Sequence, residues 1–555
     1  MIAEMSDPQV QLQDWPFHAA WRAGAMDSPL LALARAVEAC PDDRFLDICG
    51  ERCTFGEFDR QTTRLAHALR ALGVEEGETV ISFTETAMAP LLLWFAANKI
   101  GAIWVPVNTA HRGTFLSHQI NNAGGRVMLC GADLLDRVRD VLPELDAIRT
   151  ILVAGDCSGE TVANVAIAPF DDHRGEDETP IGRSVDPKEI SCLIFTSGTT
   201  GPSKACMVSH NQIAHFGWRH LEAAPQRKGD VAWSCLPIFH TGAIVSVIMS
   251  ALLSQSAGTL TARFSVSNFW YDVERTGATI TFILATMWPL LAEAPDNDAM
   301  KRCFGQLRII TGVPVTPPVR KIFHERFGVG YINSYNYGQT ECCKLGHVDF
   351  GRELPAEGSA GFVADMDYEV IIADDDDREL PRGQVGEILY RPKRPHIMFE
   401  GYWRRPDASQ AAWTNLWMHS GDLGRIDEND VLWFVDRKKD YLRRGGENVS
   451  SWELEAAFKR HPDLEDVAIH AVLSDLSEDE IKLTCVPREG TALTEEALLR
   501  WSIGQLPRFA VPRYVEFRAV LPKTPTGRVQ KYQLREEGCT PATWDRVRAG
   551  IEIPR

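Results

Sequence analysis

The sequence predicts an α/β protein with a large N-terminal domain of βαβ layers and a small C-terminal α/β domain. The first observation is length, because 555 residues are more than one hydrophobic core usually serves. The second is an alternation of short apolar runs with helical segments, which is typical of βαβ units on a parallel sheet. The third is a loop rich in glycine and hydroxyl side chains that follows an apolar strand, within residues 193–210.

Helices and strands alternate along the first part of the chain. Residues 60–72 predict a helix, because Leu65, Leu69 and Leu72 share one face and Gly73 suits the left-handed end of a helix. The other elements expected in this region are helices over 30–39 and 91–99, and strands over 80–83, 103–107, 127–129 and 150–153.

The middle of the chain continues the pattern with more loops. Residues 155–188 are rich in Asp, Gly and Pro, and we expect a surface excursion there. The apolar helix expected over 243–253 is about half the length needed to span a bilayer. Strands are expected over 279–285 and 308–314, and the acidic run 373–378 is expected to form a solvated hairpin tip without a function.

Composition excludes several classes of protein. With 58 basic and 76 acidic residues the formal net charge is −18, which argues against nucleic-acid or anionic-membrane partners. The thirteen cysteines have no framework spacing and no CxxC pair, so we expect reduced thiols in a cytoplasmic protein and no zinc site. The N-terminal residues lack a basic start and an apolar core, so no signal peptide and no transmembrane segment are expected.

The loop TSGTTGPSK, residues 196–204, has the composition of a phosphate-binding loop. Glycines let backbone N–H groups approach an anion, hydroxyls add neutral donors, and a lysine adds a mobile cation. Five hydroxyls, two glycines and a lysine in nine residues exceed what an ordinary turn needs, and the spacing does not match a Walker loop. The candidate ligand-binding residues of the loop are Thr196, Ser197, Gly198, Thr199, Thr200, Gly201 and Lys204.

This loop resembles the signature of the adenylate-forming (AMP-binding) enzymes, which include acyl-CoA synthetases, adenylation domains of peptide synthetases and luciferases. The motif NYGQTE, residues 336–341, matches the second signature of that family. The resemblance covers residues from about 30 to 535, with the main blocks in order. It is closest to the carnitine/crotonobetaine-CoA ligase branch, through the segments 269–270, 325–329, 435–437 and 444–450. The resemblance to that branch does not identify the acid that this chain uses.

The resemblance implies roles for the nucleotide-site residues. Tyr337 offers a ring to adenine, Thr340 a hydroxyl to the α-phosphate, and Glu341 with Thr196 oxygen ligands to Mg²⁺. His240, in the block LPIFHTG, is expected to line and gate the acyl site, although a lone histidine is more often a core residue. The other residues implied to contact the nucleotide are Gly312, Val313, Pro314, Asn336, Gly338 and Gln339.

The resemblance implies further residues toward the C-terminus. Asp422, in the block HSGDLG, is expected to bind the ribose hydroxyls, because a carboxylate can accept hydrogen bonds from both of them. Arg437 is the second expected contact of the ribose. Lys439 falls on the family's pivot residue, which divides the chain into an N-terminal domain, 1–436, and a mobile C-terminal domain, 437–555. The segment with Gly445, Gly446 and Glu447 is expected to lie beside the pantetheine of CoA.

One position departs from the family pattern. Where the family has its adenylation lysine, this sequence has Arg528, and Lys531 follows three residues later. Arginine keeps the positive charge but not the compact ammonium group. Either Arg528 takes the role, Lys531 reaches in, or the first half-reaction is impaired; its place in the motif favours Arg528.

The implied function is an ATP-dependent, AMP-forming acyl-CoA synthetase that uses ATP, Mg²⁺ and coenzyme A. Its substrate would be a small-molecule carboxylic acid that is not an amino acid, since His240 stands where amino-acid-activating relatives usually carry an aspartate. Two alternatives stay open: an adenylating enzyme that loads a discrete carrier protein, and an inactive nucleotide- or acyl-binding relative. The sequence leaves open which acid is used and whether the protein is a homodimer.

Overall fold

The computed structural model describes most of the chain. The described residues are 15–196, 203–284, 287–312, 315–364, 366–438, 442–444, 447–449, 451–473, 479–503, 506, 510–523 and 529–553. The predicted site residues that lie outside them are Ser197, Gly198, Thr199, Thr200, Gly201, Val313, Pro314, Lys439, Gly445, Gly446 and Arg528.

The chain forms two compact units. Unit 1 comprises residues 1–370, 391–416 and 430–432, and unit 2 comprises residues 371–390, 417–429 and 433–555. Segments of the chain before residue 436 therefore contribute to both units. The predicted division into domains 1–436 and 437–555 remains a proposal about which segments move together.

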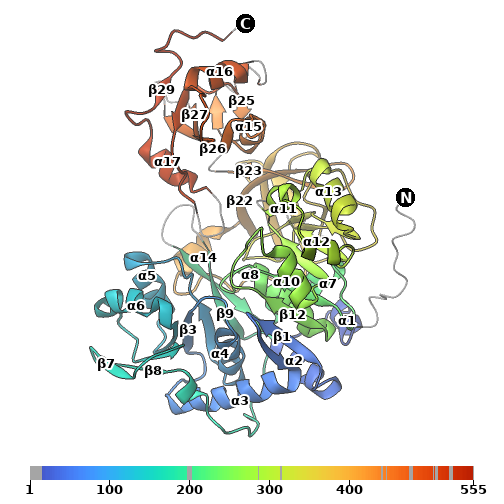
Figure 1. Cartoon of the computed structure of the whole chain (residues 1–555), viewed down its shortest axis with the longest axis vertical. Helices are drawn as coiled ribbons and strands as arrows, with labels where there is room; N and C mark the ends of the chain where they lie inside the picture. Colours follow the sequence, from blue (N-terminus) through green and yellow to red (C-terminus); the bar gives the residue numbers. More distant parts are fainter. Residues whose placement is uncertain are drawn as a thin grey trace. The chain divides into compact units, whose positions relative to one another are not determined.

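The first large sheet of unit 1 has eight strands in the order β10-β9-β4-β3-β5-β6-β8-β7 (Figure 1). Its central strands β4, β3, β5, β6 and β8 are parallel, while β7 and β10 run antiparallel to their neighbours at the two edges. The predicted strands are present because their continuous apolar runs are buried on both faces. The bounds are β3 Thr79–Phe83, β4 Ile103–Pro106, β5 Val127–Gly131, β6 Thr150–Ala154, β7 Glu160–Val162, β8 Val165–Pro169, β9 Ile190–Thr196 and β10 Lys204–Ser209.

The second large sheet of unit 1 has seven strands in the order β15-β14-β13-β11-β12-β1-β2. All neighbours are parallel except β1 and β2, which pair antiparallel. The bounds are β1 Arg44–Ile48, β2 Glu51–Thr54, β11 Val231–Ser234, β12 Ala257–Leu260, β13 Ile280–Ile283, β14 Ile309–Gly312 and β15 Tyr331–Asn333. A small antiparallel sheet follows, made of β16 Asn336–Tyr337, β17 Gly346–His347 and β18 Phe362–Val363.

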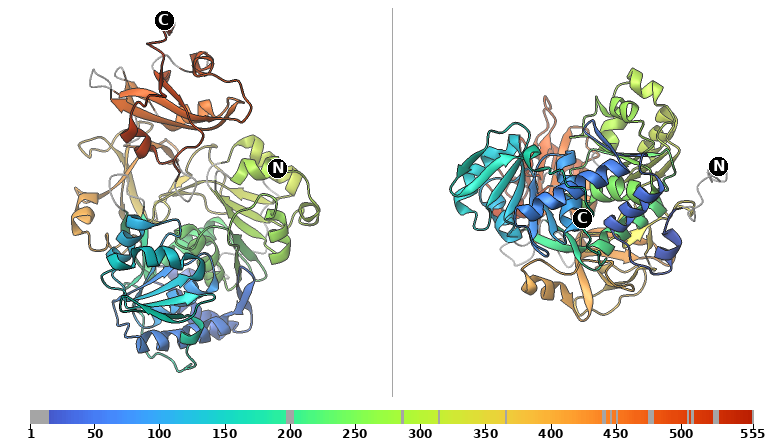
Figure 2. Two further views of the ribbon diagram at one scale, coloured as in Figure 1. Left: turned by 60° about the vertical axis from the view of Figure 1, so that its left-hand side comes forward. Right: turned by 90° about the horizontal axis from the view of Figure 1, so that it is seen from below.

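Helices cover these sheets, and Figure 2 shows the β5–β8 region (cyan) apart from the α10–α13 region (yellow-green) of unit 1. α3 begins with a capping box of Thr54 and Glu57 and packs on the buried helix α4, where Phe58 meets Phe95 edge to face. The bounds are α1 His18–Arg22, α2 Pro29–Ala39, α3 Phe55–Ala71, α4 Met88–Lys99, α5 Gly113–Ala123, α6 Leu135–Val141, α7 His210–Ala223, α8 Thr241–Ala243, α9 Ser250–Ser254, α10 Phe269–Thr276, α11 Met287–Glu293, α12 Asp298–Arg302, α13 Pro317–Phe327 and α14 Pro406–Ala412.

Two expectations for this part of the chain need correction. The excursion expected over 155–188 contains β7 and β8, and β8 joins the eight-stranded sheet beside β6. The helix expected over 243–253 is interrupted by a π-helical segment, Ile244–Met249. Serine hydroxyls donate back along it, from Ser250 to the Ser246 carbonyl and from Ser254 to the Ser250 carbonyl, a pattern that loosens regular helix geometry.

Unit 2 contains three groups of strands. β20 Gly386–Pro392 and β23 Leu432–Arg437 both pair with β22 Trp417–Ile426, and β24 Leu442–Arg444 pairs with β25 Glu447–Val449. The third group is a four-stranded sheet of β26 Leu464–Leu473, β27 Asp479–Pro487, β28 Tyr514–Phe517 and β29 Trp544–Asp545. The helices of unit 2 are α15 Ser451–Phe458, α16 Glu495–Ile503 and α17 Lys531–Glu537. Strand β19 Tyr368–Ala373 begins in unit 1 and ends in unit 2, and β21 Trp413–Thr414 belongs to unit 1.

The acidic run 373–378 follows β19 and forms a turn, as predicted. Among the helices of the described residues, we find none with the length and apolar character that crossing a bilayer requires.

Candidate active site

The predicted phosphate loop joins β9 to β10, and the residues at its two ends are paired. Thr196 lies opposite Lys204 in the antiparallel ladder, and the Thr196 hydroxyl donates to the Lys204 carbonyl over 3.3 Å. The residues between 197 and 202 lie outside the described part of the chain. The ladder therefore fixes Thr196 and Lys204 at the base of the loop.

A buried thiol connects Thr196 with Glu341. Cys206, two residues after Lys204, is fully buried, and its thiol interacts with the Thr196 hydroxyl and with the Glu341 carboxylate. Burial first, and the negative charge of Glu341 second, hold the pKa of Cys206 well above its usual value. The thiol therefore stays neutral, and both predicted Mg²⁺ ligands are close enough to influence its pKa.

Tyr402 holds both Glu341 and Lys204. Its hydroxyl donates to Glu341 Oε1 over 2.8 Å, and Lys204 Nζ lies 4.2 Å from the centre of its ring, a cation–π contact. Burial and the neighbouring Glu341 carboxylate raise the pKa of Tyr402, so the hydroxyl keeps its proton and remains a donor. Cys206 and Tyr402 also pair through an isolated backbone bridge.

Tyr337 and Gly338 begin a tight turn. Tyr337 is buried and its carbonyl accepts from Leu345 N over 2.8 Å. A Cβ on Gly338 would lie 1.9 Å from the Cys343 carbonyl oxygen, so no other residue fits there without moving the backbone. Within the same turn, the Thr340 carbonyl accepts from Gln212 Nε2 over 3.1 Å, and the Gln339 carbonyl accepts from Cys342 N over 3.2 Å.

Two features beside this turn suit a nucleotide. The Asn336 Oδ1 atom is buried and accepts no hydrogen bond from the residues that the structure describes, which a ligand donor would remedy. Gly312 ends β14 where a Cβ would lie 2.3 Å from the Ile283 carbonyl, so the backbone there stays bare of side chain. A flat ring can approach such a backbone closely.

His240 is the N-cap residue of α8. It is exposed, and its Nδ1 accepts from Gly242 N over 3.2 Å. His240 is therefore not the buried core histidine that was the alternative interpretation. Its role in gating the acyl group remains a prediction.

The remaining predicted residues belong to unit 2. Asp422 is buried in β22, Arg437 ends β23, and Glu447 begins β25. The neighbouring Lys438 bonds Glu387 and Asp375, each over 3.0 Å. These contacts fix the strand that precedes the predicted pivot.

Lys531 is occupied by partners inside unit 2. Its Nζ donates to Ser451 Oγ over 2.6 Å and pairs with Glu455 Oε1 over 2.8 Å. Ser451 in turn donates its hydroxyl to Asp436 Oδ2 over 2.6 Å. Lys531 thus joins the first turn of α17 to α15.

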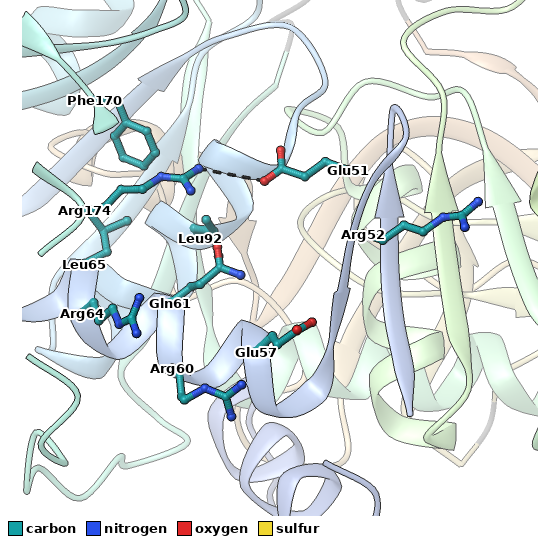
Figure 3. Close-up of a pocket in the computed structure, with 10 residues that line it drawn as sticks. All are labelled: Glu51, Arg52, Glu57, Arg60, Gln61, Arg64, Leu65, Leu92, Phe170 and Arg174. Atoms are coloured by element: carbon teal, nitrogen blue, oxygen red, sulfur yellow. Dashed lines mark ion pairs between the residues drawn. The ribbon is translucent and has the colours of Figure 1, made fainter. Parts of the chain in front are cut away.

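A surface hollow elsewhere in unit 1 contains none of the predicted site residues. Its volume is ≈ 430 Å³, and Figure 3 shows that side chains from β2, α3 and the segment after β8 line it. Three of the arginines that line it form ion pairs: Arg52 with Asp47 over 2.8 Å, Arg174 with Glu51 over 3.9 Å, and Arg64 with Glu178. We assign it no function.

The residues present fit a magnesium ion. Mg²⁺ is commonly held by one or two carboxylates together with substrate phosphates rather than by a cage of protein ligands. Glu341 and Thr196 offer such a hard-oxygen set beside the phosphate loop. The described residues contain no group of three or more His, Cys, Asp or Glu that could hold a metal without substrate.

The described residues form an α/β fold, in which Thr196 and Lys204, at the two ends of the predicted phosphate loop, lie near the predicted Mg²⁺ ligand Glu341. Residues 33–403 match the AMP-binding enzyme family, and residues 453–528 match the AMP-binding enzyme C-terminal domain. The chain belongs to the AMP-binding enzyme family, and the predicted resemblance is confirmed.

Similar known proteins agree with the family. A crotonobetaine/carnitine–CoA ligase of Salmonella arizonae is 29% identical over 488 residues, which cover 87% of this chain and 93% of that protein. ATP-bound MatB from Rhodopseudomonas palustris has a TM-score of 0.78 at 24% identity, covering 91% of this chain and 98% of that one. The anthranilate CoA ligase AuaEII in complex with anthranoyl-AMP has a TM-score of 0.81 at 22% identity, covering 98% and 100%. The predicted fold class, α/β with a large N-terminal and a small C-terminal domain, is confirmed.

Proposed function

We propose that this chain activates a carboxylic acid with ATP to give acyl-AMP, and then transfers the acyl group to coenzyme A. The observation that carries the proposal is the position of Glu341, whose carboxylate accepts from Tyr402, the residue whose ring also contacts Lys204 at the end of the predicted phosphate loop. The class is shown by the family match and the relatives: the chain is an AMP-forming acyl-CoA synthetase that uses ATP, Mg²⁺ and CoA. The assignment of roles to single residues is our proposal.

In the first half-reaction a carboxylate oxygen attacks the α-phosphorus of ATP. The new bond is O–P, the bond that breaks is that between the α-phosphorus and the bridging oxygen, and pyrophosphate leaves with the electron pair. Thr340 and Lys204 would bind the phosphate oxygens on which negative charge builds up. Glu341 and Thr196 would hold Mg²⁺, which would supply charge stabilisation at the phosphates.

In the second half-reaction the CoA thiol attacks the acyl carbonyl, a C–S bond forms, and AMP leaves with the electrons of the C–O bond. We propose that residues 437–555 turn about Lys439 between the two steps. Asp422 and Arg437 would hold the ribose, and the segment with Gly445, Gly446 and Glu447 would lie along pantetheine. Cytoplasmic location is part of the same proposal, since CoA and ATP are intracellular substrates.

The products distinguish this function from its alternatives. Purified protein supplied with ATP, Mg²⁺ and a panel of carboxylic acids should release AMP and pyrophosphate with the accepted acid, and adding CoA should yield the thioester. Release of ADP and phosphate would contradict acyl adenylation. Pyrophosphate release that stops at acyl-AMP until a carrier protein is added would favour the carrier-loading alternative, and no turnover with any acid would favour the inactive relative.

Tyr402→Phe should slow the adenylation half-reaction about tenfold, because a hydrogen bond to a charged group contributes roughly 1.5–3 kcal/mol. Phenylalanine keeps the ring under Lys204 but removes the donor to Glu341, so the carboxylate loses its orientation. The measurement is pyrophosphate release as a function of Mg²⁺ and ATP concentration. The matched control is Tyr271→Phe, which changes an exposed tyrosine of α10. Equal rates in both variants would show that Tyr402 does not position Glu341.

A further inference from the structure

A cluster of buried and half-buried charged side chains lies in unit 1 beside the NYGQTE turn. It is built on α7, where Arg219 and Glu222 lie on one face. Its three carboxylates are Glu222, Asp349 and Asp367. Its four cations are Arg22, Arg219, Arg394 and Lys344. We call this set the buried charge cluster.

Each of the three carboxylates lies within ion-pair distance of a guanidinium group. Glu222 forms ion pairs with Arg219 and Arg22. Asp367 forms ion pairs with Arg219 Nε at 3.1 Å and with Arg394 at 3.7 Å, and Asp349 lies 3.9 Å from Arg219.

Histidines add contacts but no compensating charge. Asp349 lies 3.2 Å from His347 Nε2, and His18 and His215 lie beside Glu222 and Asp367. Burial, followed by the charge of Arg219, lowers the pKa of His347 to about 4, so this imidazole is neutral near pH 7. The other two histidines could only add positive charge.

Lys344 is the cation of this cluster without an ion pair. Its charge interacts with Asp349 and Glu222, but no carboxylate of the described residues lies within ion-pair distance of its Nζ. Burial lowers the pKa of Lys344 to about 8, which still leaves the amine mostly protonated at pH 7. The adjacent Cys343 offers no charge, because burial raises its pKa to about 12.

The cluster is therefore one negative charge short. An uncompensated buried cation is costly, and the cost is removed when an anion binds beside it. The side chain of Lys344 is half-buried. An anion that binds there would complete the set of charges.

Lys344 lies next to the predicted reaction site. A Cβ built on Gly338 comes within 3.3 Å of the Lys344 Cα, and Leu345 N donates to the Tyr337 carbonyl. Glu341 precedes Lys344 by three residues, which separates their Cα atoms by at most about 10 Å. This distance is within the length of a small organic acid.

We propose that Lys344 binds a second carboxylate of the acid substrate, so that this enzyme prefers dicarboxylic acids to monocarboxylic acids of equal length. The proposal rests on the proposed function and names the substrate class of the same site. It also sets the chain apart from the relatives named for crotonobetaine and carnitine, because these acids carry a fixed positive charge that Lys344 would repel.

The test compares matched acids: butanoate with succinate, hexanoate with adipate, and benzoate with terephthalate, with adipate monomethyl ester as the uncharged analogue. In the wild-type protein, kcat/KM for pyrophosphate release should be about tenfold or more higher for a dicarboxylate than for its partner. The monomethyl ester should behave like hexanoate. A preference for the monocarboxylates, or for carnitine, would overturn the proposal while the proposed function stands.

Variants locate the effect on the side chain. Lys344→Met should lower kcat/KM for the dicarboxylates about 10- to 100-fold and leave the monocarboxylates nearly unchanged, and Lys344→Arg should keep the preference. The matched control is Lys321→Met, at an exposed lysine of α13. Because Lys344→Met could disturb folding, the thermal stabilisation of each variant by adipate is measured beside that by hexanoate.

Two other results would overturn the proposal. An equal loss for all acids together with a raised KM for ATP would assign Lys344 to a nucleotide phosphate. Failure of every acid to release AMP and pyrophosphate would overturn the proposed function itself, and the substrate class with it.

Discussion

Glu341→Gln should slow pyrophosphate release by roughly a hundredfold or more, the usual order for losing one stabilising group of a transition state. The amide keeps the size of the side chain, and its oxygen can still accept from Tyr402, so the change removes charge rather than shape. The loss should appear in the adenylation half-reaction. The measurement is single-turnover formation of acyl-AMP with the accepted acid.

Two comparisons make this result specific to Glu341. Glu325→Gln applies the same chemical change to an exposed residue of α13 and should leave the rate unchanged. Thioester formation from supplied acyl-AMP should fall far less in Glu341→Gln than adenylation does. A rate within a few-fold of wild type in the first half-reaction would remove Glu341 from the metal site.

Arg528→Ala should lower the rate of acyl-AMP formation about a hundredfold, while thioester formation from supplied acyl-AMP continues. Arg528 lies outside the described residues, so the expectation comes from its place in the family motif and from the contacts of its competitor. Within unit 2, Lys531 contacts Ser451 and Glu455. If Lys531 moved into the active site, the carboxylate of Glu455 would lose this ion pair. Arg528 is the better candidate for the adenylation cation.

Lys531→Ala should act on stability. The loss of the bonds to Ser451 and Glu455 should destabilise unit 2 by about 1–3 kcal/mol and lower both half-reactions together. Denaturant unfolding and the two half-reactions are measured on both variants. Selective loss of adenylation in Lys531→Ala, with stability unchanged, would transfer the catalytic role to Lys531. No loss in either variant would show that this segment supplies no cation.

Much of unit 1 could be predicted from local patterns. The strands β3, β5 and β6 are short, continuous apolar runs, and α3 has one apolar face and a glycine after its last turn, so neighbouring residues alone specify them. β7 and β8 could not be recognised in this way, because their segment is rich in turn-forming residues. β8 is a strand because β6 offers it an edge to pair with.

In the candidate site, too, only residues that belong to local sequence motifs could be predicted. Thr196, Lys204, Tyr337 and Glu341 could be predicted because each lies in one of two recognisable motifs, TSGTTGPSK or NYGQTE. Cys206 and Tyr402 belong to no such run.

The contacts of these two residues are purely tertiary. Tyr402 reaches Glu341 across 61 positions of sequence, and only folding brings them together. The partners of Lys531 were missed for the same reason, because Ser451 lies 80 positions away. Tertiary contacts between single residues leave no periodic signal in one sequence.

Unit 2 encloses a hydrophobic core of its own, which includes Phe458, Ile469, Leu483, Leu498 and Val515. Unit 1 has separate cores around its two sheets. Because each unit has its own core, we expect the melting curve of the whole chain to be the sum of two transitions. One melting temperature then describes neither unit. The change in the free energy of unfolding caused by a substitution is defined only when it is measured on the unfolding transition of the unit that contains the substituted residue.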